Sequence, residues 1–377
     1  MRVLYVASGL GHGGAETQLI ALIGELHRLG HEPAIYLLTD YAPRLEQLPP
    51  DGVVRVVDRK KRRLDFGVLR RLRRFIREWR PDIVHGFLFD GNVYARIAAK
   101  GLRVSVLNSE RNDDYLLTWP QKFVHWPTRH WASAVVANSH AGRRHAMRMF
   151  GLPESRTHVV WNGADLGRVD SLARTTHGCY RRLFFGTSDV FVAVVVARIA
   201  YQKDIILALD VAADLFERDP RWRVVIVGVP ESQVFRGSNV DSHDAYAAAV
   251  QVHHAAMRHR DRVHFAGQRD DALCIIADSD VLFSTSRREG FPNAVLEAMG
   301  CGTPVVSTAY SDIALILPEP WQVVGSRSPA ELASAIERAR SEASQLAPKQ
   351  RQWVVDHATN ARSASAMLDV YRRYQSG

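Results

Sequence analysis

Short apolar runs alternate with longer segments of helical periodicity along the whole chain. In the first half, the predicted strands are residues 3–7, 34–38, 83–85, 104–107 and 134–137. In the second half, they are residues 190–197, 224–228, 263–265, 281–285 and 304–307. Buried runs of this length, separated by segments long enough for a helix, indicate βαβ units and parallel sheets. We therefore expect an α/β protein.

The same rhythm occurs twice, which predicts two domains. A chain of 377 residues is long for a single domain, and the periodicity lapses between residues 163 and 187. We assign residues 1–165 to an N-terminal Rossmann-like domain and residues 166–358 to a C-terminal one. Residues 359–377 contain a last helical stretch that we expect to cross back to the first domain. Open parallel sheets bind ligands at the carboxyl ends of their strands, so two such domains facing each other predict a cleft.

The composition changes this picture little. The fractions of 46% hydrophobic and 24% charged residues are ordinary for a globular protein. No apolar run reaches the roughly 18 residues that a membrane-spanning helix needs. The three cysteines, Cys179, Cys274 and Cys301, form no CxxC or metal-binding pattern, which indicates a reducing compartment. We therefore expect a cytoplasmic protein.

A glycine-rich loop follows the first predicted strand. Gly13 and Gly14 end this loop, and a helix with one apolar face runs from there to Gly30. Glycines let the main chain approach a ligand, and a helix N-terminus attracts anions. Gly13 and Gly14 are therefore candidates for binding a diphosphate. The spacing is not the G-x-G-x-x-G dinucleotide fingerprint, and a tight strand-to-helix turn explains the same pattern.

The most informative segment, residues 281–306, places two carboxylates beside a predicted helix N-terminus. A strand ends near residue 285, a loop carries Glu289, and Pro292 is expected at the first position of a helix that contains Glu297. Main-chain N–H groups at such a helix start can bind a phosphate. A carboxylate can accept hydrogen bonds from two neighbouring hydroxyls, so this pair of carboxylates suits a ribose and a hexose.

This segment resembles the E-x7-E element of the GT-B glycosyltransferases of the retaining family 4. The flanking S-x-x-E-G-F-P-N and E-A-M-x-C-G-x-P-V-V make the match long and specific, and the resemblance covers most of the chain. It implies two facing Rossmann-like domains with a cleft between them. It also implies that Glu289 contacts the donor sugar and that Glu297 holds the ribose hydroxyls. The donor-binding residues that it adds around these two are Gly290, Phe291, Pro292 and Asn293.

Two basic residues, Arg198 and Lys203, follow a predicted strand of the second half, and Lys203 is expected to open the next helix. A bidentate arginine and a point-charge lysine can clamp a diphosphate and stabilise its charge as it leaves. Taken alone, the two residues could equally be surface cations. With the family resemblance, we assign both to donor binding and catalysis. We identify no Asp-x-Asp motif near a strand end that would bind Mg²⁺, so we expect no metal and no other cofactor.

The acceptor side is less well defined. His85 ends a strand of the first domain, and it is either an acceptor-side residue or a hydrogen-bonded core histidine. Relatives carry a histidine beside the reacting sugar where this chain has Phe87 and Asp90, so Asp90 is a candidate for a catalytic polar role. Arg111 and Asn112 resemble an Arg-Asn element of related enzymes and are acceptor-side candidates, although a surface loop explains them too.

Two further segments depart from the family pattern. Relatives carry a glycine-rich loop and a glutamate after the strand at residues 304–307, where this chain has Ala309-Tyr310-Ser311-Asp312. The usual Gly-Asp-Gly-Pro after residues 226–228 is replaced by Val229-Pro230-Glu231. These departures keep open the alternative of a sugar-nucleotide-binding protein without turnover.

A basic stripe runs from Arg59 to Arg80. It contains eleven Lys or Arg and two acidic residues, an excess equal to the +9 net charge of the whole chain. Apolar residues recur within it at helical spacing, which predicts a basic amphipathic helix. We expect its apolar face to pack in the core and its arginines to contact an anionic membrane surface. Solvation of the arginines is the alternative. Trp119, Phe123, Trp126 and Trp131 either face lipid or acceptor, or pack between helices.

We therefore predict a retaining glycosyltransferase. It would transfer a hexosyl unit from a nucleotide sugar, a UDP-sugar in preference to a GDP-sugar, to a lipid-linked or growing cell-surface glycan. A sugar-nucleotide epimerase would need a His/Glu-rich constellation that the sequence lacks. A nucleic-acid-binding protein could use the basic stripe, but no recognition motif accompanies it, and Glu289 and Glu297 would have no role. We expect no nucleic-acid partner.

Overall fold

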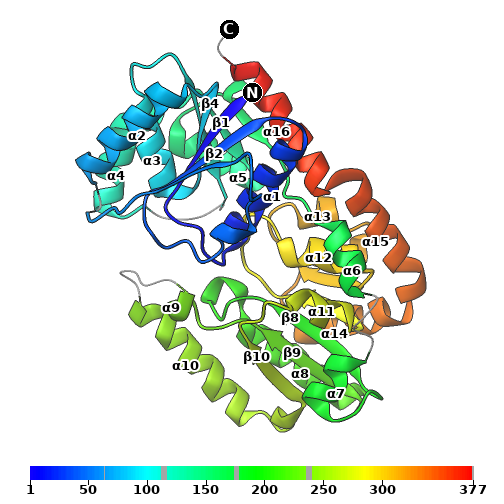
Figure 1. Cartoon of the computed structure of the whole chain (residues 1–377). Helices are drawn as coiled ribbons and strands as arrows, with labels where there is room; N and C mark the ends of the chain where they lie inside the picture. Colours follow the sequence, from blue (N-terminus) through cyan, green and yellow to red (C-terminus); the bar gives the residue numbers. More distant parts are fainter. Residues whose placement is uncertain (63, 112–116, 174–177, 235–239, 376–377) are drawn as a thin grey trace. The chain divides into compact units, whose positions relative to one another are not determined.

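The computed structural model describes the chain except residues 63, 112–116, 174–177, 235–239 and 376–377. The chain divides into two compact units (Figure 1). The N-terminal unit comprises Met1–Gly163 together with Asn360–Gly377, and the C-terminal unit comprises Ala164–Thr359. The two crossing points lie within two residues of the boundaries expected from the sequence.

The N-terminal unit is built on a seven-stranded parallel sheet in the order β3-β2-β1-β4-β5-β6-β7. The order reverses between β1 and β4, which pair directly, so the carboxyl ends of these two strands form the switch point of the sheet. The strands are β1 (Arg2–Ala7), β2 (Glu32–Leu37), β3 (Val54–Val57), β4 (Ile83–Gly86), β5 (Ser105–Glu110), β6 (Ala134–Ala137) and β7 (Thr157–Val159).

Helices cover both faces of this sheet. One face packs against α1 (Gly14–Arg28) and α16 (Asn360–Tyr374), and the side chain of Tyr371 lies fully buried in that core. The other face packs against α2 (Phe66–Trp79) and α3 (Leu88–Ala99). The remaining longer helices are α4 (Trp119–Thr128), which contacts α3, and α5 (His140–Phe150), which contacts β6 and β7.

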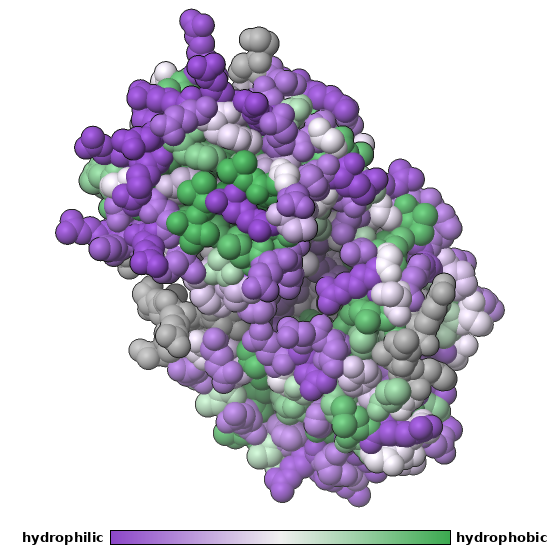
Figure 2. All heavy atoms as spheres, viewed as in Figure 1, coloured by the Kyte–Doolittle hydropathy of each residue, from purple (hydrophilic) through white to green (hydrophobic). Residues whose placement is uncertain are grey.

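Helix α2 carries five of the eleven basic residues of the basic stripe. Its buried residues, Val68, Leu69, Leu72 and Ile76, all belong to the core cluster beneath it, which confirms that the apolar face packs inward. Hydrophilic side chains predominate along the left edge of the N-terminal unit in Figure 2, where α2 lies in Figure 1, although apolar ones stand among them.

The C-terminal unit is built on a six-stranded parallel sheet in the order β10-β9-β8-β11-β12-β13, with its switch point between β8 and β11. Its strands are β8 (Phe191–Val196), β9 (Trp222–Val227), β10 (Val263–Gly267), β11 (Val281–Ser284), β12 (Val305–Thr308) and β13 (Val323–Val324). Its helices are α6 (Leu166–Ala173), α7 (Cys179–Phe185), α8 (Ile205–Arg218), α9 (Glu231–Val234), α10 (Val240–Ala256), α11 (Ala272–Ala277), α12 (Asn293–Cys301), α13 (Ile313–Ile316), α14 (Pro329–Ser341) and α15 (Ala343–His357).

All ten predicted strands are present, with ends shifted by a few residues at most. The prediction missed three strands, β3, β7 and β13, and each of them lies at the edge of its sheet. Edge strands face solvent and need no continuous apolar run. In β3, for example, Val54 and Val57 are about two-fifths exposed. The missed strands therefore lack the signal by which the central strands were recognised.

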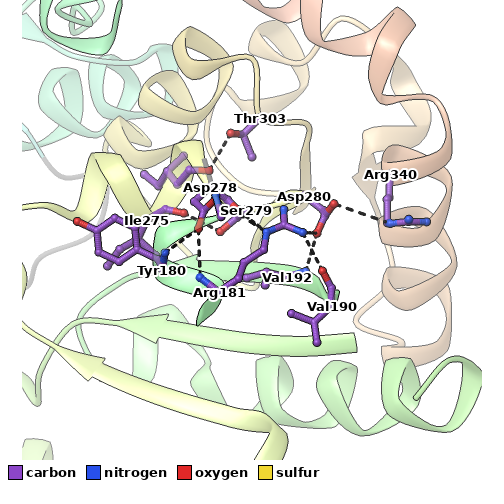
Figure 3. A network of polar contacts seen from close by, with 12 residues as sticks. Tyr180, Arg181, Val190, Val192, Ile275, Asp278, Ser279, Asp280, Thr303 and Arg340 are labelled. Carbon is purple, nitrogen blue, oxygen red and sulfur yellow. Dashed lines mark hydrogen bonds and ion pairs between the residues drawn. The ribbon is translucent and has the colours of Figure 1, made fainter. Parts of the chain in front are cut away.

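A buried carboxylate at the amino end of the second sheet fastens α7 to that sheet (Figure 3). Asp278 accepts hydrogen bonds from the main-chain N–H groups of Gly178, Tyr180 (2.9 Å) and Arg181 (3.1 Å). The guanidinium of Arg181 lies 3.2 Å from a carboxylate oxygen of Asp280 and donates to the Asp278 carbonyl at 2.9 Å. Asp278 and Asp280 thus form an Asp-x-Asp pair whose oxygens are taken up by protein donors, at the end of the sheet opposite to the switch point.

Replacing Asp278 by alanine is expected to lower the free energy of unfolding by about 2–4 kcal/mol, because it leaves buried donors at the start of α7 without an acceptor. Urea denaturation followed by circular dichroism measures the change. Glu217→Ala is the control: this carboxylate is 59% exposed and pairs with Arg258 at 3.4 Å on the surface of the same unit, so its loss should cost less than about 1 kcal/mol. Equal effects of the two variants would contradict this role of Asp278.

Candidate functional site

The switch point of the C-terminal sheet gathers the main sequence candidates. Arg198 follows β8 and Glu289 follows β11, and these two strands pair in parallel through Ala193 and Val281. Lys203 ends a single turn of 3-10 helix, Tyr201–Lys203, and only Asp204 separates it from α8. The sequence had placed Lys203 at the start of that helix. The carboxyl ends of β8 and β11 therefore present two cations and a carboxylate on one edge of the sheet.

Lys203 and Glu289 form a direct ion pair, in which the Lys203 Nζ contacts Glu289 Oε1. The hydroxyl of Ser286 donates to the same oxygen at 2.8 Å. Both charged side chains retain 14–15% of their accessible surface. The pair is therefore accessible to a small molecule, and the low solvent exposure strengthens its field.

Neighbouring groups hold this ion pair in place. The hydroxyl of Thr285 donates to the main-chain carbonyls of Lys203 (3.0 Å) and Asp204 (2.9 Å). The carboxylate of Asp204 pairs with the guanidinium groups of Arg287, at 2.6 Å, and Arg327. Asp204 itself has a left-handed main chain, with φ of 48°, a strained conformation of the kind found at functional sites. Neither Asp204 nor Arg327 was identified from the sequence.

The main chain at Arg198 depends on a glycine in the adjacent strand connection. A Cβ at Gly228 would lie 2.0 Å from the carbonyl oxygen of Ala197, and the φ of Gly228 is +147°. Only glycine allows β9 to end this close to the Arg198 segment.

Glu297 lies in the middle of α12, on the element that follows Glu289. Helix α12 begins at Asn293, so Pro292 precedes it and the prediction of Pro292 as the first helical residue is wrong by one position. The N–H of Asn293 donates to the carbonyl of Phe291 at 3.1 Å. Burial raises the pKa of Glu297 to about 7, and Arg168 opposes part of that rise.

Arg168 was not identified from the sequence. It belongs to α6, which packs so closely on α12 that a Cβ at Gly300 would lie 3.2 Å from the side chain of Leu166. The side chain of Glu297 retains intermediate exposure. With a pKa of about 7, the Glu297 carboxyl is about half ionised at pH 7. Because it is also partly exposed, a ligand that donates hydrogen bonds to it can favour the ionised form.

The segment after β12 lies against the loop that carries Glu289. The hydroxyl of Ser311 donates to the carbonyl of Gly290 at 3.2 Å, and Ser311 has a positive φ of 42°. The hydroxyl of Tyr310 donates to Ser284 Oγ at 3.2 Å. Burial, with the charge of Glu289, raises the pKa of Tyr310. Side chains of this segment thus support the loop that carries Glu289.

The candidates of the N-terminal unit lie around the switch point of the first sheet. Gly13 is the residue before α1, Gly14 is its first residue, and the Gly13 carbonyl accepts from the N–H (3.1 Å) and hydroxyl (3.2 Å) of Thr17. Asp90 lies in the first turn of α3 and forms an ion pair with Lys60. This pairing gives Asp90 a structural partner that the sequence does not reveal.

His85 lies in the core. Its ring is fully buried, Nδ1 lies 2.6 Å from the hydroxyl of Tyr371, and Nε2 lies 2.9 Å from Ser109 Oγ. Burial and the nearby charge of Arg111 lower the pKa of His85 well below its usual value. Of the two interpretations of His85, the structure therefore favours the hydrogen-bonded core histidine.

Arg111 is also buried, which lowers its pKa to about 10. Its guanidinium donates to Asn162 Oδ1 at 3.0 Å and lies over the ring of Phe87. The surface-loop interpretation of Arg111 is therefore wrong. Asn112 lies outside the described residues.

Among the described residues, no group of three or more His, Cys, Asp or Glu side chains is placed to hold a metal ion. Arg198 and Lys203 both follow β8 of the second sheet.

Comparisons with known proteins identify the family. The model named Glycosyltransferase Family 4 matches residues 12–168, and the model named Glycosyl transferases group 1 matches residues 190–342. Together they cover both units. The chain belongs to the family 4, group 1 glycosyltransferases.

Individual relatives are distant. The chain is 22% identical over 208 residues to a phosphatidylinositol N-acetylglucosaminyltransferase component of Arabidopsis thaliana, a match that covers 55% of this chain and 41% of that protein. It is 28% identical over 221 residues to the D-inositol 3-phosphate glycosyltransferase of Geodermatophilus obscurus, covering 54% of this chain and 45% of that protein. The chain thus spans less than half the length of these two relatives.

Solved structures share the whole fold. HepE of Anabaena, crystallised with UDP and glucose, superimposes with a TM-score of 0.80 at 19% identity and covers 98% of this chain and 99% of its own. The sucrose-phosphate synthase of Thermosynechococcus elongatus gives a TM-score of 0.73 at 18% identity, covering 99% of both chains. The fold is GT-B, with two Rossmann-like units.

Proposed function

We propose that this chain is a retaining glycosyltransferase. It moves a hexosyl unit from a nucleotide sugar to a lipid-linked or growing cell-surface glycan. The observation that carries the proposal is the ion pair of Lys203 and Glu289 at the switch point of the C-terminal sheet, with Arg198 on the adjoining strand end. A ligand bound there meets two cations for its diphosphate and one carboxylate for its sugar.

Each of the candidate residues has a separate role in this proposal. Arg198 and Lys203 neutralise the diphosphate as the bond between it and the anomeric carbon breaks. Glu289 lies near the reacting sugar, and Glu297 accepts hydrogen bonds from the ribose hydroxyls. The acceptor oxygen bonds to the same face of the sugar from which the diphosphate leaves, and the departing diphosphate oxygen takes the acceptor proton. No metal is required for charge neutralisation.

The preference for a UDP-sugar is supported by the UDP and UDP-glucose complexes of HepE, a protein of the same fold. The acceptor class is supported by the names of two curated relatives, which act on phosphatidylinositol and on D-inositol 3-phosphate. Both names contain a phosphorylated inositol, which is part of a lipid in the first name and a free sugar phosphate in the second. The basic stripe of α2 would favour such an acceptor at an anionic membrane surface.

A transfer assay tests the proposal. UDP- and GDP-sugars are combined with phosphatidylinositol, D-inositol 3-phosphate or a polyprenyl diphosphate-linked sugar, and nucleoside diphosphate release is followed. We expect acceptor-dependent release from a UDP-sugar, and a product whose anomeric configuration, read by NMR, equals that of the donor. An inverted product would contradict retention. Nucleotide binding without turnover across the whole panel would favour the non-catalytic binder instead.

The raised pKa of Glu297 predicts a pH-dependent affinity for the donor. The ionised carboxylate accepts both ribose hydroxyls, so affinity should be full above the pKa of about 7 and fall as the pH drops through it. Between pH 8 and pH 6, the Kd for UDP-glucose should rise about tenfold. UDP-glucose is the right probe because its diphosphate diester does not titrate in this range.

Calorimetric titration of UDP-glucose across this pH range measures the effect. Glu297→Gln should bind more weakly at pH 8 and lose most of the pH dependence. Glu337→Gln is the matched control, since this glutamate pairs with Arg218 on the surface of the same unit. A pH profile in Glu297→Gln that matches the unmodified chain would assign the titration to another group.

A further inference from the structure

Helix α4 buries polar side chains and exposes aromatic ones, which is the reverse of an ordinary surface helix. Its buried residues are His125 and Thr128. The guanidinium of Arg96, itself 1% exposed, donates to Thr128 Oγ1 at 3.1 Å and lies 3.5 Å from His125 Nδ1. Trp119, Phe123 and Trp126, at helical spacing, point away from this anchor and are 84%, 83% and 55% exposed.

The exposed rings are surrounded by basic groups. Lys122 Nζ lies 5.9 Å from the ring centre of Trp119, and the Arg129 guanidinium lies 3.9 Å from that of Trp126. Residues 117–131 contain no Asp or Glu. Such a surface of aromatic rings and cations, without acidic residues, is complementary to an anionic bilayer. At the bilayer interface, amphipathic rings lie at the level of the headgroups, and cations bind lipid phosphates.

This surface continues onto the basic stripe. Lys100, at the end of α3, lies over the ring of Trp131 at 4.6 Å, and its carbonyl accepts from Arg73 of α2 at 2.7 Å. Helix α3 contacts both α2 and α4, and Figure 1 shows the three helices on the same side of the N-terminal unit. The exposed arginines of α2 that extend the surface are Arg70, Arg74 and Arg77.

We propose that α4 inserts its aromatic face into the interface of an anionic lipid bilayer, with the arginines of α2 on the headgroups beside it. This inference deepens the proposed function, because it rests on a lipid-linked acceptor. It also assigns the two helices separate roles. The α2 arginines attract the chain to anionic lipid in a salt-dependent manner, and the α4 rings supply the apolar contact that salt does not screen.

Vesicle flotation of the full chain tests this assignment. The vesicles are phosphatidylcholine alone or a mixture with phosphatidylglycerol, at low and high salt. The variants are a triple serine replacement of Trp119, Phe123 and Trp126, and a triple glutamine replacement of Arg70, Arg74 and Arg77. Serine replacements of Leu183 and Val252, exposed apolar residues of the C-terminal unit, provide the control. The thermal shift with UDP is measured on every variant.

The unmodified chain and the control should float with anionic vesicles, and brominated lipid should quench their tryptophan fluorescence. The aromatic triple should lose about tenfold or more in partitioning at both salt concentrations, and the arginine triple should lose binding mainly at low salt. The proposal would be overturned if the aromatic triple variant floated as well as the unmodified chain. It would also be overturned if the unmodified chain were a dimer that only the aromatic triple variant converts to a monomer. Binding of the unmodified chain to RNA but not to vesicles would overturn it too. If the unmodified chain does not float with vesicles but UDP still raises its melting temperature, only this inference is refuted. If UDP does not raise the melting temperature of the unmodified chain, the proposed function is refuted.

Discussion

Replacing Lys203 by methionine is expected to lower kcat/KM for sugar transfer by about 10³-fold. The variant keeps the length of the side chain but removes the cation that pairs with Glu289. Two losses then combine. The departing diphosphate loses a preorganised positive charge, whose removal typically costs several kcal/mol of transition-state stabilisation. The Glu289 carboxylate, only 15% exposed, also loses its counter-charge.

The measurement is the initial rate of nucleoside diphosphate release, with the acceptor that the transfer assay identifies. Lys349→Met is the matched control, because Lys349 also pairs with a glutamate, Glu319, at 2.6 Å, but on the surface. That variant should retain its activity within about twofold. If Lys203→Met stays within tenfold of the unmodified chain, Lys203 does not act on the leaving group.

Glu289→Gln is expected to lower kcat by roughly 10²–10³-fold while the donor Kd changes only several-fold. Glutamine keeps an oxygen that can accept from Ser286, so the loop keeps its hydrogen bond. The charge is lost, and with it the electrostatic stabilisation of a sugar that becomes cationic in the transition state. An effect on kcat with little effect on binding is the expected signature of such a residue.

Steady-state kinetics and calorimetry on the same preparation separate these two quantities. Glu319→Gln, which breaks the surface pair with Lys349, serves as the control and should change neither. If Glu289→Gln weakens donor binding by as much as it lowers kcat/KM, the carboxylate acts in binding and not on the reacting sugar.

The central strands of both sheets could be predicted from the sequence because burial on both faces requires continuous apolar runs. Val192–Val195 and Val3–Val6 are examples, and nearly all of these side chains are fully buried. Three of the four edge strands, β3, β7 and β13, could not be predicted, since half-exposed residues such as Val54 are compatible with a loop. The switch points also required the structure, because strand order depends on pairing between distant segments.

The candidate site was predictable only where its residues are close in sequence. The segment from Val281 to Val306 carries its own strand, loop and helix signals. The groups that fasten it come from elsewhere: Asp204 lies 83 positions before Arg287, and Arg327 lies 123 positions after Asp204. Similarly, the core position of His85 depends on Tyr371, 286 positions away. No local pattern encodes such partners.

A thermal-shift titration with UDP, GDP and ADP tests the central claim, that the C-terminal unit carries a nucleotide-sugar site around Glu289 and Glu297. A ligand that binds only the native state raises the melting temperature as its concentration rises. We predict a rise with UDP that Glu297→Ala abolishes and that Glu337→Ala, the surface control, preserves. No shift with any nucleotide at millimolar concentrations, or an undiminished shift in Glu297→Ala, would contradict this claim.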